Sequence, residues 1–282
     1  MRAFWLAFVA VVCLGAREPL AQRIGHTDPA KFEIVKAVHE GPGQMSYAVL
    51  LDSHSLETNL SFVSRGVLDP KNGIGHHFHN GCEEMLIILD GEAQVTVDGR
   101  TSVLKGPAGA PCRMGHSHAV YNASDRPVQW LMINVPAIKG QNDSFNLGDP
   151  RVGVPLDPIP VFMNVRFDPA LLRPIKAMNG RAGTVQYRRT LGPAVFQTPL
   201  AYVDHLLLPP GSSVGQEAHG GAAEVYYVMS GSGTATVSSS GGAAETAPIR
   251  EGDAIPIQIN EVHAFQNTGS RPLEMLIVGV AK

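Results

Sequence analysis

The sequence predicts an all-β protein made of two similar domains in one chain. Its 282 residues include 30 Gly and 21 Pro but only 6% aromatic residues, a composition typical of many turns between short extended segments. A spaced pattern of His and Glu occurs twice, with His79 and His219 at matching places. The offset between the copies is the length of an ordinary domain, which favours two whole domains over a short solenoid repeat.

Charge and hydrophobicity exclude some classes of partner. The chain has 22 Lys and Arg against 25 Asp and Glu, a net charge of −3, and no basic run. Nucleic-acid binding needs clustered positive charge to meet phosphates, so no nucleic-acid partner is expected. A hydrophobic content of 44% indicates a globular protein.

The N-terminus has the pattern of a signal peptide. An uncharged apolar run over residues 4–14 follows Arg2, and small residues come after it. Eleven residues are too few for a membrane helix, which needs about 20, so no permanent membrane span is expected. A lipoprotein cleavage site favours a small residue before its cysteine, and Val12 before Cys13 is bulkier than that. Lipid anchoring at Cys13 is therefore only the alternative to a cleaved signal peptide. We expect residues 1–22 to be a signal peptide, the mature chain to begin between residues 16 and 23, and the protein to be exported, to the periplasm or beyond.

The mature chain would keep two cysteines, Cys82 and Cys112. In an oxidising compartment they can form a disulfide. The alternative is a pair of separate buried thiols packed as small apolar groups. The sequence leaves both open.

The first domain, residues 23–136, reads as a β-meander. Asn80-Gly81, Asp90-Gly91 and Asp98-Gly99 are dipeptides that supply positive φ in tight hairpins. Between them lie β-rich runs over residues 85–89 and 93–97, which predict consecutive antiparallel strands.

The second domain, residues 185–282, repeats this arrangement with looser turns. Gly220-Gly221 and the Gly-Ser turn at 230–233 separate β-rich runs over 225–229 and 234–237. Residues 137–184 are rich in Pro and Asn and predict an ordered connector, with one short helix over residues 169–178.

The first copy of the pattern predicts a metal site. Alternate side chains on a strand share a face, so His77 and His79 project together, about 7 Å apart at the backbone. The Asn80-Gly81 turn returns the chain and brings Glu84 beside them, and His118 arrives from a later strand. Three imidazoles and one carboxylate leave open positions on an octahedral ion, as a catalytic site requires. The neighbouring histidines, His76 and His116, should point the other way.

These segments resemble the paired motifs of the cupin superfamily, and the whole chain resembles a bicupin. The front motif of the family is met by His77, His79, Glu84 and Gly91, and the rear motif by Gly115, His118 and Asn122. Lys71 stands where the front motif has Gly, and Arg113 where the rear motif has Pro. The resemblance implies two tandem jelly-roll β-barrels, with a divalent ion held by His77, His79, Glu84 and His118.

The second copy departs from the family pattern. Glu217 replaces the first His, and Gln258 and Asn260 replace the Pro and Gly of the rear motif. Two carboxylates and two imidazoles can still hold a hard divalent ion. The alternative is a degenerate half retained for packing. The predicted ligands are Glu217, His219, Glu224 and His263.

The resemblance implies a metal-dependent enzyme acting on a small, oxygen-rich chelating substrate, with an oxidoreductase of dioxygenase type as the first hypothesis. The alternatives are a carbon–carbon lyase of the oxalate decarboxylase type and a non-enzymatic sugar- or solute-binding cupin. Ile74 and Gly75 stand where oxalate decarboxylases carry a substrate-binding Arg, which weakens the lyase reading. The ion is Mn, Fe, Zn, Cu or Ni, and the sequence does not choose among them.

No catalytic residue is assigned beside the metal. Glu83 should face away from Glu84 as a surface carboxylate, and Tyr121 and Arg113 should pack at the barrel rim. Since the chain already contains a pair of barrels, a monomer suffices, and a homo-oligomer is the alternative.

Overall fold

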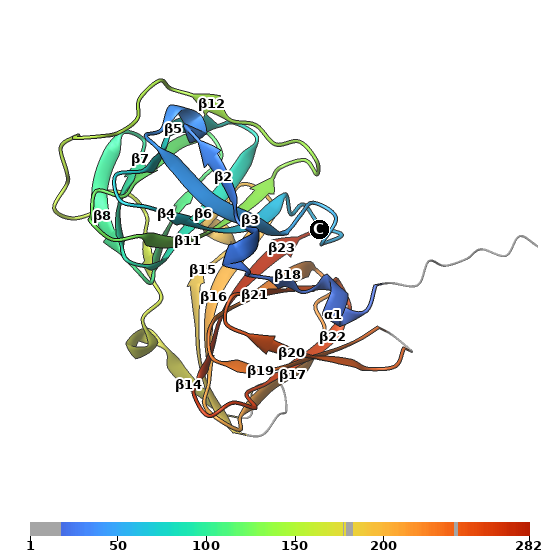
Figure 1. Ribbon diagram of the computed structural model, residues 1–282. Helices are drawn as coiled ribbons and strands as arrows, with labels where there is room; N and C mark the ends of the chain where they lie inside the picture. The colour runs from blue at the N-terminus through green and yellow to red at the C-terminus, as the bar shows by residue number, and fades with distance from the viewer. Residues whose placement is uncertain (1–17, 177, 179–182, 240–241) are drawn as a thin grey trace, which may run out of the picture.

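The computed structural model describes residues 18–176, 178, 183–239 and 242–282, and strands make up most of them. They form two β-barrels, the first above the second in Figure 1, so the predicted fold class is confirmed. The helical segments in these ranges are short connections, with bounds α1 Leu20–Arg23, η1 Pro29–Lys31, η2 Val38–Glu40, η3 Pro169–Leu171 and η5 Pro193–Val195.

Two sheets form the first barrel by packing face to face. Their strand orders are β13-β9-β6-β11-β4-β3-β2 and β12-β5-β10-β7-β8. The predicted hairpin at Asp98-Gly99 joins β7 to β8, with φ of 48° and 75° in the left-handed region that a tight turn demands. The strand bounds are β2 Glu33–Lys36, β3 Gln44–Leu51, β4 Phe62–Leu68, β5 Gly73–His79, β6 Cys82–Asp90, β7 Glu92–Val97, β8 Arg100–Lys105, β9 Ala108–Cys112, β10 His116–Tyr121, β11 Val128–Pro136, β12 Phe145–Asn146 and β13 Val165–Arg166.

The second barrel repeats this plan. Its sheets have the orders β1-β21-β18-β23-β16-β15-β14 and β17-β22-β19-β20. The strand bounds are β1 Gly25–His26, β14 Arg173–Lys176, β15 Thr184–Leu191, β16 Leu200–Leu208, β17 Ser213–Glu217, β18 Ala222–Ser230, β19 Ser232–Ser238, β20 Glu245–Arg250, β21 Asp253–Ile257, β22 Val262–Gln266 and β23 Leu273–Ala281.

The larger sheets of the two barrels pack against each other, which explains the continuous apolar runs in the sequence. Along β6, Leu86 and Ile88 enter the core of the first barrel. Met85 and Ile87 point the opposite way, into a core shared with Val225 of the second barrel. A strand buried on both faces needs apolar residues at every position rather than at alternate ones.

A buried carboxylate also joins the barrels. Glu83 was expected at the surface, and this is wrong: its exposed fraction is 0%. Its oxygens accept hydrogen bonds from the backbone N–H of Gln197 and Thr198 and from the Thr198 hydroxyl, at 2.6–3.1 Å. Because the sheets stack at this point, the outward face of β6 meets the second barrel instead of solvent.

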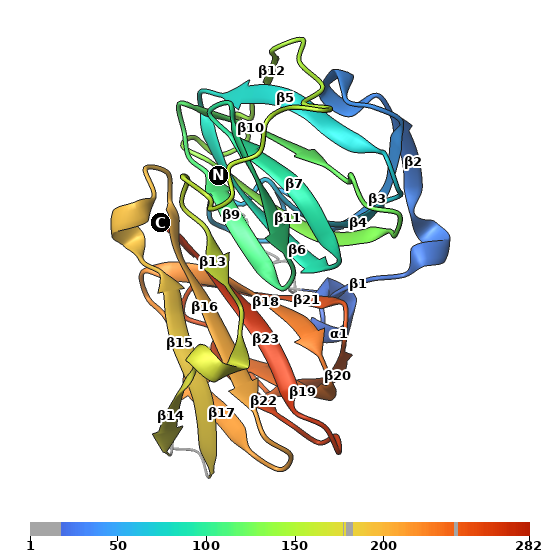
Figure 2. The ribbon, with the colours of Figure 1, turned by 90° about the vertical axis from the view of Figure 1, so that its left-hand side faces the viewer.

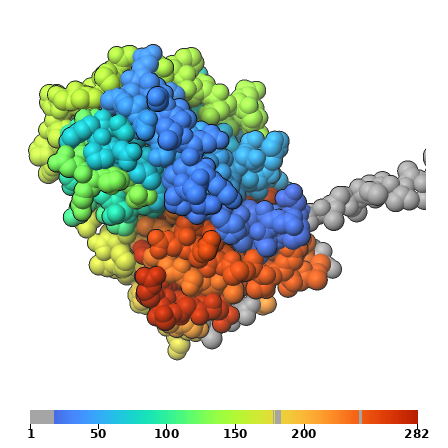
Figure 3. All heavy atoms as spheres, in the orientation of Figure 1, coloured from blue at the N-terminus to red at the C-terminus, as the bar shows by residue number. Residues whose placement is uncertain are grey.

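In both barrels, some strands come from distant parts of the chain. The N-terminal strand β1 pairs with β21, with Gly25 opposite Ala254, so the start of the described chain joins the second barrel. In Figure 3 this blue segment lies across the boundary between the barrels. The connector returns β12 to β5 and β13 to β9 of the first barrel before it descends to β14 (Figure 2). The domain limits 23–136, 137–184 and 185–282 stay predictions.

Two smaller expectations have an outcome, and the predicted signal peptide stays a prediction. The expected helix over 169–178 is wrong, because the turn η3 is followed by β14, where Pro174 lacks the N–H that a helix interior needs. Cys82 and Cys112 are free thiols, both buried. The apolar core of the predicted signal peptide falls on residues 1–17, outside the described residues. Within the described ranges, no helix has the length and apolar character of a membrane span.

Candidate metal centre

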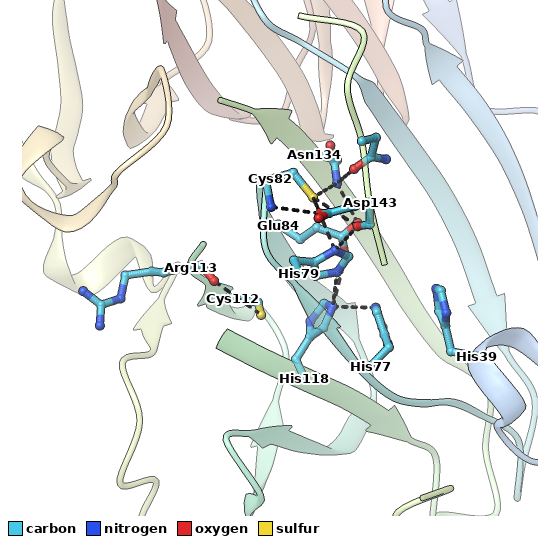
Figure 4. A network of polar contacts seen from close by, with 12 residues as sticks. His39, His77, His79, Cys82, Glu84, Cys112, Arg113, His118, Asn134 and Asp143 are labelled. Carbon is cyan, nitrogen blue, oxygen red and sulfur yellow. Dashed lines mark hydrogen bonds and ion pairs between the residues drawn. The ribbon is translucent and has the colours of Figure 1, made fainter. Parts of the chain in front are cut away.

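Three elements bring the predicted ligands of the first barrel together. His77 and His79 lie on β5, and antiparallel pairing places His118 of β10 directly opposite His77. Glu84 comes from β6, after the Asn80-Gly81 turn has reversed the chain. Figure 4 shows the four side chains converging in the barrel, and their candidate ligand atoms all lie within 4.8 Å of one another.

The cluster is buried and closely spaced. None of the four residues has an exposed fraction above 4%. Nε2 of His118 lies 2.9 Å from Nε2 of His77 and 3.2 Å from Nε2 of His79. Oε2 of Glu84 lies 3.1 Å from Nε2 of His118 and 3.6 Å from Nε2 of His79.

Hydrogen bonds on the far side of the rings aim the Nε2 atoms at one point. Nδ1 of His77 donates to the carbonyl of Gly75 at 2.8 Å, and Nδ1 of His79 donates to the carbonyl of Asp143 at 2.7 Å. Metal-bound histidines are oriented in this way, with the second ring nitrogen held by a carbonyl or carboxylate.

The converging atoms do not all form good hydrogen bonds with one another, and a bound cation would satisfy them by coordination. Nε2 of His118 cannot make a good hydrogen bond to two imidazole nitrogens at once, yet it lies close to both. Among the described residues, Oε2 of Glu84 is a buried oxygen with no hydrogen-bond partner. Buried orphans of this kind are costly, so the donor set fits a divalent ion.

The charges of the cluster agree with that fit. Burial and the nearby His118 lower the pKa of His77 to about 2, so its imidazole is neutral. Burial opposes the charge of His79, but contacts with Cys82 and Glu84 raise its pKa to about 11. Burial alone would raise the pKa of Glu84, and the imidazoles of His118 and His79 instead hold it well below its usual range. The metal-free pocket therefore keeps one proton that a cation would displace.

Several supporting residues carry no signal in the sequence. Asn134 of β11 donates to Oε1 of Glu84 at 2.9 Å and to Oδ1 of Asn142 at 3.2 Å. The carboxylate of Asp143 accepts from the N–H of Gly81 at 2.9 Å, and Sγ of Cys82 lies 3.3 Å from Nδ1 of His79. The connector, read only as a linker, thus completes the surroundings of the cluster.

A further histidine stands beside the ligands. The ring of His39 stacks on His77 with centroids 3.7 Å apart and planes 13° apart. Its Nδ1 lies 2.8 Å from Oδ1 of Asn146 on β12. Ala37, His39 and Glu40 all have positive φ, a strained arrangement of non-glycine residues that is common at functional sites.

The remaining candidates lie elsewhere. His76 contacts the Ser117 hydroxyl at 2.9 Å, and His116 contacts Asp98 at 2.6 Å, so both point away from the cluster as predicted. Arg113 also points away from it in Figure 4, with Nη2 3.3 Å from His116.

The second barrel assembles a different cluster. Candidate ligand atoms of Glu217, His219 and His263 lie within 4.8 Å of one another. Glu224 is not part of that trio, although its Oε2 lies 3.4 Å from Nε2 of both histidines. Two tyrosine hydroxyls, which the sequence did not point to, bind its carboxylate: Tyr202 at 2.7 Å and Tyr226 at 3.3 Å.

A pair of jelly-roll barrels with a buried three-His, one-Glu cluster in one of them defines a bicupin. The family model described as Cupin domain matches residues 64–134 and 204–279, one match in each barrel. The chain belongs to the cupin family.

Individual relatives carry oxalate in their names. The Oxalate-binding protein of Thermotoga maritima is 35% identical over 104 residues, which cover 37% of this chain and 82% of the relative. The oxalate decarboxylase of Lactobacillus farciminis, solved as a formate complex, has a TM-score of 0.65 at 18% identity, covering 91% of this chain and 86% of that chain. The oxalate decarboxylase of Bacillus subtilis, which has Mn(II) centres, gives 0.63 at 17% identity, covering 91% and 77%. At these identities the two structures show a shared fold.

Proposed function

We propose that the first barrel binds a divalent metal ion through His77, His79, Glu84 and His118, and that the ion holds a small, oxygen-rich chelating substrate of the oxalate class. The observation that carries this is the convergence of three buried Nε2 atoms and Oε2 of Glu84 within 4.8 Å of one another. Four protein ligands leave positions for a chelating dianion on a six-coordinate ion.

The chain's own residues supply orientation and burial. The carbonyls of Gly75 and Asp143 fix the ring orientation of His77 and His79, and Asn134 fixes Glu84. When bound, a divalent ion supplies Lewis acidity and, if redox-active, electron transfer. Burial strengthens the attraction between such a centre and an anion, because the local dielectric is low.

For the reaction, a metal-dependent oxidoreductase remains the proposal, and the second candidate is binding of oxalate without turnover. The similarity to the Thermotoga maritima Oxalate-binding protein supports this second candidate. The two candidates share the substrate class and differ in whether a product appears. The N-terminal pattern of Arg2 and residues 4–14 supports export as the compartment of either.

Product analysis on the metal-loaded protein tests the proposal. The protein is purified from its exported fraction, its metal is identified by elemental analysis, and ¹³C-oxalate is added with that metal present. Oxidation by O₂ gives two CO₂ and H₂O₂ per oxalate, with two protons consumed. Carbon–carbon cleavage gives one CO₂ and one formate, with one proton consumed. Saturable calorimetric binding without product assigns the binding function.

The site variants complete this test. Replacement of His79 by Ala should abolish both metal content and oxalate binding, whereas replacement of the exposed His54 should change neither. Retention of stoichiometric metal and oxalate by the His79→Ala protein would refute the assigned site.

A further inference from the structure

We infer that Tyr226 closes the cluster of the second barrel to metal ions, so that the chain binds one ion and not two. The count of one rests on the proposed function of the first barrel. The closure of the second barrel rests on separate contacts, described below.

Tyr226 occupies a place that is apolar in the first barrel. It follows Glu224 by two residues on β18, as Leu86 follows Glu84 on β6, where Leu86 belongs to the apolar core. The ring of Tyr226 stacks on Phe265 with centroids 4.1 Å apart. Its hydroxyl oxygen consequently reaches the cluster, 2.9 Å from Nε2 of His263.

The proton positions show what this contact does. Nδ1 of His263 donates to the carbonyl of Glu261 at 3.2 Å, because a carbonyl can only accept. With the proton of the neutral ring on Nδ1, the lone pair lies on Nε2. The Tyr226 hydroxyl lies 2.9 Å from that nitrogen and 3.3 Å from Oε2 of Glu224. Its one proton serves one acceptor at a time, and the shorter contact is to Nε2, whose lone pair a metal ion would need.

The carboxylate of Glu224 is satisfied in the same way. The Tyr202 hydroxyl donates to Oε1 at 2.7 Å. The Tyr202 ring fits because the strand position opposite Glu224 is Gly279, where a Cβ would lie 2.2 Å from Cζ of Tyr202. The matching position opposite Glu84 is Asn134, which binds Oε1 and leaves Oε2 to face Nε2 of His118 and His79.

The two barrels therefore differ in what a cation would encounter. In the first barrel it meets three imidazole nitrogens and a carboxylate oxygen that contact only one another, with no tyrosine hydroxyl of the described residues bonded to them. In the second barrel it must displace the hydroxyl of buried Tyr226 before it can coordinate His263, and the hydroxyl of Tyr202 before it can reach Oε1 of Glu224. A site whose donors satisfy one another is a polar core, which the sequence pattern alone does not distinguish from a metal centre.

Metal stoichiometry tests the inference. The full chain is stripped with chelator, loaded with Mn(II), passed through a desalting column and measured by elemental analysis. We expect one ion per chain in the wild type and two in Tyr226→Phe, because this change frees Nε2 of His263 and keeps the ring packed on Phe265. Tyr202→Phe is the matched control: it removes a hydroxyl from Glu224 but leaves His263 occupied, so it should stay at one.

Additional variants locate each ion. The His79→Ala variant should bind no ion, against one in the wild type. The double variant His79→Ala/Tyr226→Phe should bind one ion, against two in Tyr226→Phe alone. If Tyr226→Phe does not fold, as judged by circular dichroism, Tyr226→Leu reproduces the residue of the first barrel. A wild type with two ions, or a Tyr226 variant that folds and gains none, overturns the inference.

Two further outcomes are separable. A visible charge-transfer band with Fe(III) that disappears in Tyr226→Phe would overturn the inference by making Tyr226 a phenolate ligand. A wild type with no ion, together with a gain of one in Tyr226→Phe, would refute the proposed function of the first barrel while upholding the closure of the second.

Discussion

The ring of His39 lies nearly parallel to the ring of His77, with centroids 3.7 Å apart. The contact joins a strained turn to a metal-ligand candidate from a different part of the chain. Stacking of this kind contributes about 0.5–1.5 kcal/mol beyond the area that it buries. It restricts His77 to the orientation in which Nε2 faces the cluster.

Replacement of His39 by Ala should weaken Mn(II) binding by about three- to tenfold, because the stacking energy then no longer restricts His77. Isothermal titration or electron paramagnetic resonance measures this. His39→Phe keeps a flat ring and should restore most of the affinity. An unchanged affinity in the Ala variant would show that the stack does not support the site.

Metal removal should lower the stability of the protein. A ligand that binds only the folded state stabilises it by about 2.7 kcal/mol at a hundred times its Kd. Thermal unfolding with and without chelator should show this difference in the wild type. His118→Ala should lose it, and the exposed His54→Ala should keep it. A chelator effect that persists in His118→Ala would place the stabilising ion elsewhere.

Glu83→Ala should destabilise the joined barrels by about 3 kcal/mol, because it removes a buried carboxylate and leaves the partly buried N–H groups of Gln197 and Thr198 without this acceptor. Urea unfolding followed by circular dichroism gives the free energy. The exposed Glu92→Ala on β7 is the control and should change the free energy of unfolding by less than about 0.5 kcal/mol. Equal losses in both variants would contradict the role of Glu83.

The metal-free protein should lose stability in mild acid through His263. Its pKa is about 4 in the folded protein, against 6.5 when unfolded, so the unfolded state takes up the proton first as the pH falls. The stabilisation is complete above pH 6.5 and is lost between about pH 6.5 and 4, at most about 3 kcal/mol. Unfolding series at several pH values should show a shallower decline for His263→Gln than for the wild type, and parallel curves would contradict the assignment.

Leu20 should behave as a core residue of the second barrel. Its exposed fraction is 1%, and it packs in the same apolar cluster as Leu206 and Val228. Leu20→Ala should therefore cost about 2–4 kcal/mol of unfolding free energy. The same burial favours signal cleavage before Leu20, within the expected range of 16–23, and intact-mass measurement of exported protein determines the start. A signal peptide of residues 1–22 would remove Leu20 from this core, so its burial favours the earlier part of the 16–23 range. Exported protein that begins after Leu20 and is fully stable would contradict the core role of Leu20.

The ligand cluster of the first barrel was accessible to sequence reasoning because its geometry is mostly local. Alternation along one strand sets His77 and His79 on one face, and the Asn80-Gly81 turn brings Glu84 back to them. Only His118 required the long-range pairing of β10 with β5, and there the family motif supplied the information. Metal binding itself at all the predicted positions stays a prediction.

The residues that were missed depend on contacts between distant segments. Asp143 reaches His79 because the connector returns to pair with β5, and nothing in its Pro- and Asn-rich composition indicates that return. Glu83 was placed at the surface because the strand pattern does not show that a second barrel covers β6. Tyr226 looked like an ordinary aromatic of an apolar strand, since its hydroxyl matters only once His263 lies opposite.

The pairing of β1 with β21 sets an order of events during synthesis. The first described strand of the chain has its partner at residues 253 and 254, so it cannot take its place until almost the entire polypeptide has been made. The contacts around the first-barrel cluster can form earlier in synthesis, because His79 needs only the carbonyl of Asp143, which is made well before residues 253 and 254. The N-terminal strand thus becomes part of the second barrel only when the C-terminal half of the chain folds.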